Sequence, residues 1–151
     1  ISYSKDSDKP SIPHLHAVEE ALCFGWIDGI AKKLDSGRSA QRFTPRRPKS
    51  NWTELNKERA KRLIQSGKMT EAGSKVLPDL SSNSFQIPKD ILEALQANIQ
   101  TWNNFQTFPD VYKRIRIGYI EEVRKQPSVF QKRLENFLKK TSENKMFETM
   151  E

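Results

Sequence analysis

Apolar and polar residues alternate along one early stretch of the chain, whereas most of the remaining pattern repeats apolar residues at helical spacing. Residues 26–34 are rich in β-forming side chains, and residues 38–44 alternate until Pro45 ends the pattern. The sequence Asp-Ser-Gly at 35–37 separates the two runs and is typical of a turn. The pattern therefore predicts a β-hairpin in which residues 26–34 pair with residues 38–44.

The loop length decides which side chains of this hairpin share a face. A three-residue loop with Gly37 in the left-handed conformation places residue 26 opposite 46, 28 opposite 44 and 30 opposite 42. One face then holds Ile27, Ala31 and Phe43, and the other holds Trp26, Asp28, Arg42, Thr44 and Arg46. A two- or four-residue loop shifts the pairing by one residue and groups Phe43 with Trp26 instead, so both registers stay open.

Helical spacing accounts for most of the other apolar residues. Ser11 is expected to cap a helix that ends at Gly25, Ser50 one over residues 51–66, and Thr70 a short one through Leu77. Three later helices begin near prolines: one at Pro88 that continues through Trp102, Phe105 and Phe108, one at Pro109 and one at Pro127. We expect an α+β fold with five or six helices packed on a small antiparallel sheet and a predominantly helical C-terminal half.

The length of 151 residues is that of one ordinary domain. We expect a single α+β domain over residues 1–140 and a frayed tail over residues 141–151, where the periodicity ends. Because Ile1 is not an initiator residue, the sequence is also expected to begin inside the domain.

Composition excludes several classes of site. One Cys permits no internal disulfide, and two His with one Cys are too few for a His/Cys metal site. No nucleotide-binding loop, nucleophile elbow or pair of catalytic acids is visible. We therefore predict no catalytic residue, no cofactor and no metal, and we regard an enzymatic role as uncertain and less favoured than binding. No apolar run approaches the ~18 residues of a membrane span, and a cytoplasmic location is expected.

Charge is concentrated in one segment. Residues 42–68 hold nine of the 26 basic side chains but two of the 19 acidic ones, so this basic segment carries a net charge equal to the +7 of the whole chain. An anionic partner should therefore meet the basic segment.

Two groups of candidate site residues follow. Cations just before a helix N-terminus favour anions, which predicts an anion site formed by Arg42, Arg46, Arg47, Lys49 and Ser50. An adjoining pocket on the Trp26 face is predicted to hold Trp26, Asp28, Thr44, Trp52, Asn56 and Arg59. In the competing interpretation, Arg42 and Arg46 pair with Asp28 and cover Trp26, which is a structural role.

Several motifs occur in one order: GWIDGIAKKLD, QRFTPRRPKSNWTELN and SGKMTEAG. This series resembles the bacterial YdeI/OmpD-associated family, well over residues 9–73 and more loosely through Val123. The resemblance implies a small α+β domain of the CyaY/YjbR type. It also implies an uncharacterised role linked to an outer-membrane porin and to protection against bacteriocins or cationic antimicrobial peptides. The family's TRxRRI-like element stands here as SVFQKRL, which departs from the family pattern.

The leading interpretation is a non-enzymatic binding or stress-tolerance protein with a basic anion-binding face. The partner would be a phosphate-bearing ligand, an acidic protein surface or, with less support, nucleic acid. The alternatives are an enzyme or small-ligand pocket at the Trp26/Arg42 face and a nucleic-acid-binding module.

Overall fold

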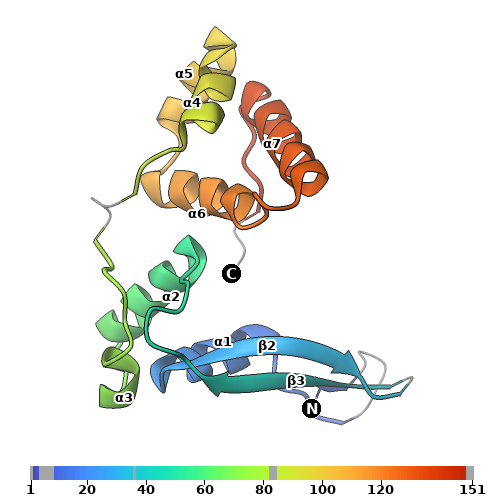
Figure 1. Cartoon of the computed structure of the whole chain (residues 1–151), viewed down its shortest axis with the longest axis vertical. Helices are drawn as coiled ribbons and strands as arrows, with labels where there is room; N and C mark the ends of the chain where they lie inside the picture. The colour runs from blue at the N-terminus through green and yellow to red at the C-terminus, as the bar shows by residue number, and fades with distance from the viewer. Residues whose placement is uncertain (1, 4–8, 36, 82–84, 149–151) are drawn as a thin grey trace. The chain divides into compact units, whose positions relative to one another are not determined.

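Figure 1 shows the chain in a computed structural model, which describes residues 2–3, 9–35, 37–81 and 85–148. The chain divides into two compact units. The first unit comprises Ile1–Asn51 and Arg59–Leu80, and the second comprises Trp52–Glu58 and Ser81–Glu151. The expected single domain over residues 1–140 stays a prediction, and each unit is described by itself below.

The sheet of the first unit is the predicted hairpin with one short addition. Strand β2 (Trp26–Lys33) pairs antiparallel with β3 (Arg38–Pro45), and the two-residue strand β1 (Ser2–Tyr3) pairs with the other edge of β3. The hairpin prediction is confirmed. Its turn includes Ser36, so the predicted loop geometry lies outside the described residues.

The register changes part-way along the hairpin. Lys33 lies opposite Ser39 and Ala31 opposite Gln41, as the three-residue loop predicts, but an irregularity between Asp28 and Ala31 shifts the rest by one residue. Beyond it Trp26 lies opposite Pro45 and Asp28 opposite Phe43. The predicted pairing of residue 26 with 46 and of 28 with 44 is therefore wrong, because a bulge adds a residue to one strand and reverses the faces beyond it.

Helix α1 (His14–Cys23) follows the predicted apolar pattern and buries Val18, Leu22 and Cys23. Its N-cap residue is Pro13, which makes no side-chain capping bond, so the expected Ser11 cap is wrong. Gly25 follows the helix with φ of 74°, where a side chain would meet Val76 and the Ala72 carbonyl. Glycine is needed there for both conformation and space.

Helix α3 (Glu71–Ser74) is held against the end of α1 by backbone contacts. Thr70 caps α3 as predicted: its Oγ1 accepts from the Gly73 N–H, and it also donates to the Cys23 carbonyl. A Cβ on Gly73 would lie 2.2 Å from that carbonyl oxygen. Much of the SGKMTEAG motif is thus explained by close backbone packing.

Helix α2 (Glu54–Gln65) begins later than predicted. Thr53 Oγ1 accepts a hydrogen bond of 3.1 Å from the Asn56 N–H, so Thr53 caps the helix and the expected Ser50 cap is wrong. Lys49 has φ of 61°, and residues 51–53 precede the helix in non-helical conformation. Left-handed Lys49 turns the chain before the helix, so the first helical residue comes later in the sequence.

The second unit is helical, with α4 (Lys89–Gln96), α5 (Ile99–Thr107), α6 (Asp110–Glu121) and α7 (Pro127–Ser142). Its core contains Ile91, Leu95, Phe105, Ile117 and Phe137. The expected single helix after Pro88 is two helices, because Asn98 caps α5 through the Thr101 N–H. This break raises the number of described helices to seven and leaves the predicted α+β class, with its helical C-terminal half, confirmed.

Candidate functional site

The first unit contains an open apolar groove of about 630 Å³ between α1 and the Trp26 end of the hairpin. Hydrocarbon makes up most of its lining, which comes from Ile12, Ala17, Ala21, Phe24, Trp26 and Phe43. His16 and Glu20, one helical turn apart on α1, complete it. We refer to it as the Trp26 groove.

Three large apolar side chains of the Trp26 groove are exposed. Ile12 is 68% exposed, Phe24 49% and Trp26 41%. One exposed apolar residue needs no explanation, but several around one concavity mark a binding surface.

The local sequence explains how the groove forms. Gly25 turns the chain sharply between α1 and β2, so Phe24 and Trp26 stand on either side of the turn. The shifted register then gives Trp26 and Phe43 the same face of the hairpin, because Pro45 and Asp28 are their partners. This is the alternative register that the sequence left open.

Arg46 is buried and hydrogen-bonded within the protein, so it is not an exposed cation for an anion. It is 6% exposed, and its Nη1 donates to Ser50 Oγ at 3.4 Å and to the Asn51 carbonyl at 3.2 Å. Burial lowers the pKa of Arg46, and the negative charge of Asp28 opposes that shift. These contacts let Arg46 hold residues 46–51 in a tight turn, which is a different structural role from the predicted pairing with Asp28 over Trp26.

The neighbouring cations behave differently. Arg42, Arg47 and Lys49 are exposed. Arg42 and Thr44 alternate with Phe43 along β3 and so occupy the face opposite Trp26 and Phe43. The anion-site residues are therefore divided, with Arg46 and Ser50 bonded to each other and the other three pointing cationic groups at solvent.

The predicted pocket residues are also divided. Trp52 and Asn56 belong to the second unit, whereas Trp26, Asp28, Thr44 and Arg59 belong to the first. Burial lowers the pKa of half-buried Arg59, while the charges of Glu19 and Asp28 oppose that shift. Asp28 thus acts electrostatically on both Arg46 and Arg59, whereas the competing interpretation paired it with Arg42 and Arg46.

Sequence reasoning missed most of the Trp26 groove. It selected Trp26 but not Ile12, His16, Glu20 or Phe24, which precede Gly25 and lie outside the hairpin and the basic segment. The useful feature was Phe24: it is a large aromatic residue between the end of a helical pattern and Gly25, where no core position is predicted.

Metal and membrane sites receive no support from the described part of the chain. No group of three or more His, Cys, Asp or Glu side chains there is placed to hold a metal ion. No helix within the described ranges is long and apolar enough to cross a membrane.

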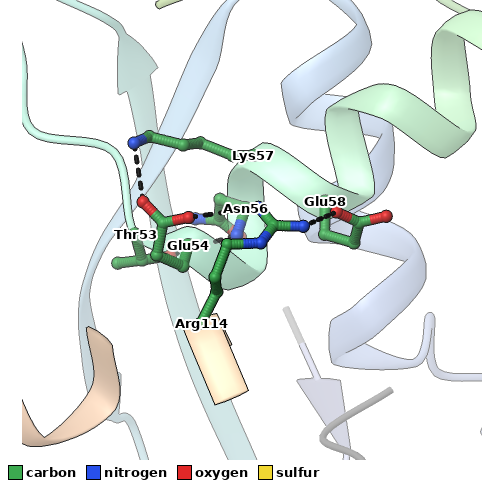
Figure 2. Close-up of polar contacts among 6 residues, drawn as sticks. All are labelled: Thr53, Glu54, Asn56, Lys57, Glu58 and Arg114. Atoms are coloured by element: carbon green, nitrogen blue, oxygen red, sulfur yellow. Dashed lines mark hydrogen bonds and ion pairs between the residues drawn. The ribbon is translucent and has the colours of Figure 1, made fainter. Parts of the chain in front are cut away.

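The second unit holds a buried ion cluster (Figure 2). Arg114 from α6 is 9% exposed and reaches Glu54 at 3.5 Å and Glu58 at 3.3 Å. Lys57 makes a bond of 2.6 Å to the other oxygen of Glu54. With two acids and two bases in mutual contact, this cluster is internally neutral, which is typical of a structural ion pair network.

The comparisons divide the chain in a similar way. A family model described as a domain of unknown function (DUF8412) matches residues 1–76, about half of the chain. The chain belongs to this family. A second model, described as bacteriocin-protection, YdeI or OmpD-associated, matches residues 84–144 and confirms the predicted family. No curated protein and no solved structure matches the chain, so the CyaY/YjbR likeness stays a prediction.

The position of the YdeI/OmpD-associated match differs from the position of the motifs. The motifs lie within residues 9–73, in the DUF8412 part, whereas the YdeI/OmpD-associated part begins after them. In the DUF8412 part, Gly25, Thr70 and Gly73 serve turns and close backbone contacts. These motif residues therefore report how the first unit folds, whereas such contacts do not explain the exposed Trp26 that lines the groove.

Proposed function

We propose that this protein is a cytoplasmic binding protein, with a bacteriocin-protection or stress-tolerance role, whose first unit binds an anionic amphipathic ligand. The apolar part of the ligand lies in the Trp26 groove, and its charged group meets exposed cations of the basic segment. The observation that carries the proposal is the set of three exposed apolar side chains, Ile12, Phe24 and Trp26, around one groove of about 630 Å³.

Exposed cations follow β3 at the end of the hairpin where Trp26 lies. Pro45 lies opposite Trp26, and the Arg46 N–H donates to the Gly25 carbonyl at 2.9 Å. Arg47 is two residues beyond Pro45, so its Cα lies within about 8 Å of the Pro45 Cα. Because Arg46 is occupied by the turn, exposed Arg47 and Lys49 are the cations that we assign to the ligand.

Binding is favoured over catalysis by the groove's composition. Among the described lining residues, only His16 and Glu20 are able to exchange a proton, and the remainder offers hydrocarbon. An apolar surface of this kind stabilises a ligand by removing its hydrocarbon from water and offers little to stabilise developing charge.

Decyl phosphate, a single-chain phosphomonoester, tests this proposal by titration calorimetry below its micelle concentration. Trp26→Ala should weaken binding about tenfold or more, since a large indole contact is lost. Ile30→Ala is the matched control, because Ile30 lies on the same strand, is 83% exposed and does not line the groove. No binding by the wild type, or equal binding by Trp26→Ala and wild type, would refute the proposal.

The charged group is tested separately. Arg47→Ala with Lys49→Ala should weaken decyl phosphate binding and leave binding of an uncharged decyl glycoside unchanged, because the cations contact the phosphate alone. If both ligands weaken equally, the cations act through the fold and their assignment is wrong.

Nucleic acid is the second candidate, favoured by the exposure of Arg42, Arg47 and Lys49 in a segment of net charge +7. Binding of a short duplex should be micromolar at best and should weaken steeply with salt. A titration that is flat in salt removes this candidate.

Direct capture of cationic peptides is disfavoured because like charges repel at long range, so we assign any protection to an indirect route.

A further inference from the structure

We propose that the second unit carries a separate binding site for a small oxyanion, formed by Arg116 of α6 and Arg133 of α7. The ligand class is an inorganic phosphate or sulfate or the carboxylate of a small molecule, all of which present two or more oxygens to guanidinium groups. This site is independent of the Trp26 groove and of the basic segment.

The two arginines line one cavity of about 180 Å³ together with Tyr119, Asn136, Phe137 and Phe147. Arg116 and Tyr119 are three residues apart on α6, and Arg133 and Asn136 are three apart on α7, so each helix turns a pair of polar side chains to the same side. The volume is below that of pockets for drug-sized molecules and suits a small anion with a few waters.

Arg116 is a buried cation with few internal partners. It is 8% exposed, it donates from Nη2 to the Glu148 carbonyl, and its guanidinium lies 4.7 Å from the Phe147 ring centroid and 5.6 Å from that of Tyr112. A neutral carbonyl and two ring faces stabilise the cation, but none of them neutralises its charge.

Arg133 is held in a fixed orientation beside the same cavity. Its guanidinium lies 3.6 Å from the centroid of the Tyr119 ring, and its Nη1 donates to the Tyr119 carbonyl. Each guanidinium has five N–H donors, and within the described residues each gives one hydrogen bond, so most donors remain for a ligand. Fixed guanidiniums bind an anion at less entropic cost than mobile ones.

The charge of this cavity distinguishes it from the other arginines of the unit. Arg114 contacts two carboxylates, and Arg124 contacts Asp90 and Glu121. No acidic residue is among the described residues that line the Arg116/Arg133 cavity. Burial raises the pKa of Glu122 and the Arg133 charge opposes that rise, so Glu122 is the acid that competes for Arg133 from outside the cavity.

The segment after α7 forms one wall. The Phe147 N–H donates to the Tyr112 hydroxyl at 3.1 Å, and Lys140 Nζ lies 4.6 Å from the Phe147 ring centroid. These contacts place the Phe147 ring beside Arg116, where it shields the guanidinium from water and strengthens its attraction to an anion.

In the test, inorganic phosphate, sulfate and acetate are each titrated into the full chain at low ionic strength. Binding is measured by NMR of the arginine Nε–H signals and by calorimetry. At least one anion should shift the Nε–H signals of Arg116 and Arg133 saturably. Arg133→Gln should weaken its binding about tenfold, because charge-assisted hydrogen bonds are lost. The anion that binds tightest identifies the source among phosphate, sulfate and carboxylate.

Arg124→Gln is the matched control. It removes the same charge from the same unit, and Arg124 also lies over an aromatic ring, 4.6 Å from the Phe130 centroid, but both of its acid partners are present. Binding in this variant should equal that of the wild type. The proposal is overturned if none of the three anions shifts the Arg116 and Arg133 signals, or if both variants lose binding equally. Loss in Arg47→Ala instead would assign the anion to the basic segment.

Discussion

The two units place several of their arginines differently. In the first unit, Arg42 and Arg47 are exposed and belong to a segment that carries the net charge of the chain. In the second, Arg114 and Arg116 are buried between acids or aromatic rings. Exposed cations change association with partners, whereas buried ones also change the stability of the fold, so local charge density is a poor guide to which arginines matter for folding.

The two units also differ in how tightly a glycine is packed, and substitution of these glycines gives the largest expected effect on stability. Gly73→Ala in the first unit should destabilise by about 3 kcal/mol, because its Cβ would meet a backbone oxygen that cannot move alone. Gly118→Ala in the second unit is the comparison: its Cβ would lie 3.1 Å from Glu54 Cγ, a milder overlap than the 2.2 Å from a backbone oxygen at Gly73, and alanine favours a helix. Urea unfolding followed by circular dichroism measures both. Equal effects would contradict the close packing of α3 on Cys23.

Arg114→Met tests the buried ion cluster. We expect a loss of about 2 kcal/mol, since the change leaves Glu54 and Glu58 without their shared cation while keeping most of the hydrocarbon stem. Urea unfolding measures this loss. A second change, Glu58→Gln, removes one of the repelling carboxylates and should recover part of the stability. If Arg114→Met is as stable as the wild type, the cluster contributes nothing to the fold.

Arg46→Ala separates a buried from an exposed arginine in adjacent positions. Removal of its bonds to Ser50 and Asn51 should cost about 1.5 kcal/mol and loosen the turn at residues 46–51. The urea midpoint and the amide hydrogen exchange of the Ser50 N–H, which donates to the Arg47 carbonyl at 3.1 Å, both report it. An unchanged urea midpoint together with slow exchange of the Ser50 N–H would show that Arg46 does not hold the turn.

Arg47→Ala completes the pair and has the smallest expected effect on folding. Its stability should stay within about 0.5 kcal/mol of the wild type, because the side chain is exposed. Its retention on an anion-exchange column at constant pH should increase, since the positive face loses a charge. A large fall in stability would show that Arg47, like Arg46, contributes to the fold.

The sequence alone determined the features that depend on neighbouring residues. The alternation of residues 26–44 determined the hairpin, Thr70 determined the start of α3, and Pro109 marked the start of α6. It also located the cations of the basic segment and indicated the YdeI/OmpD-associated family. Local pattern suffices for these because propensity, capping and charge act over one to four residues.

Only the tertiary structure decided which side chains share a face of the hairpin with Trp26 and which arginines are exposed. One extra residue at the bulge between Asp28 and Ala31 groups Trp26 with Phe43, and a left-handed Lys49 moves the start of α2 to Glu54. Arg46 and Arg47 are identical neighbours, yet one is buried and the other exposed. The physical reason is that burial and register depend on contacts distant in sequence, where a shift of one residue reverses the face of every side chain beyond it.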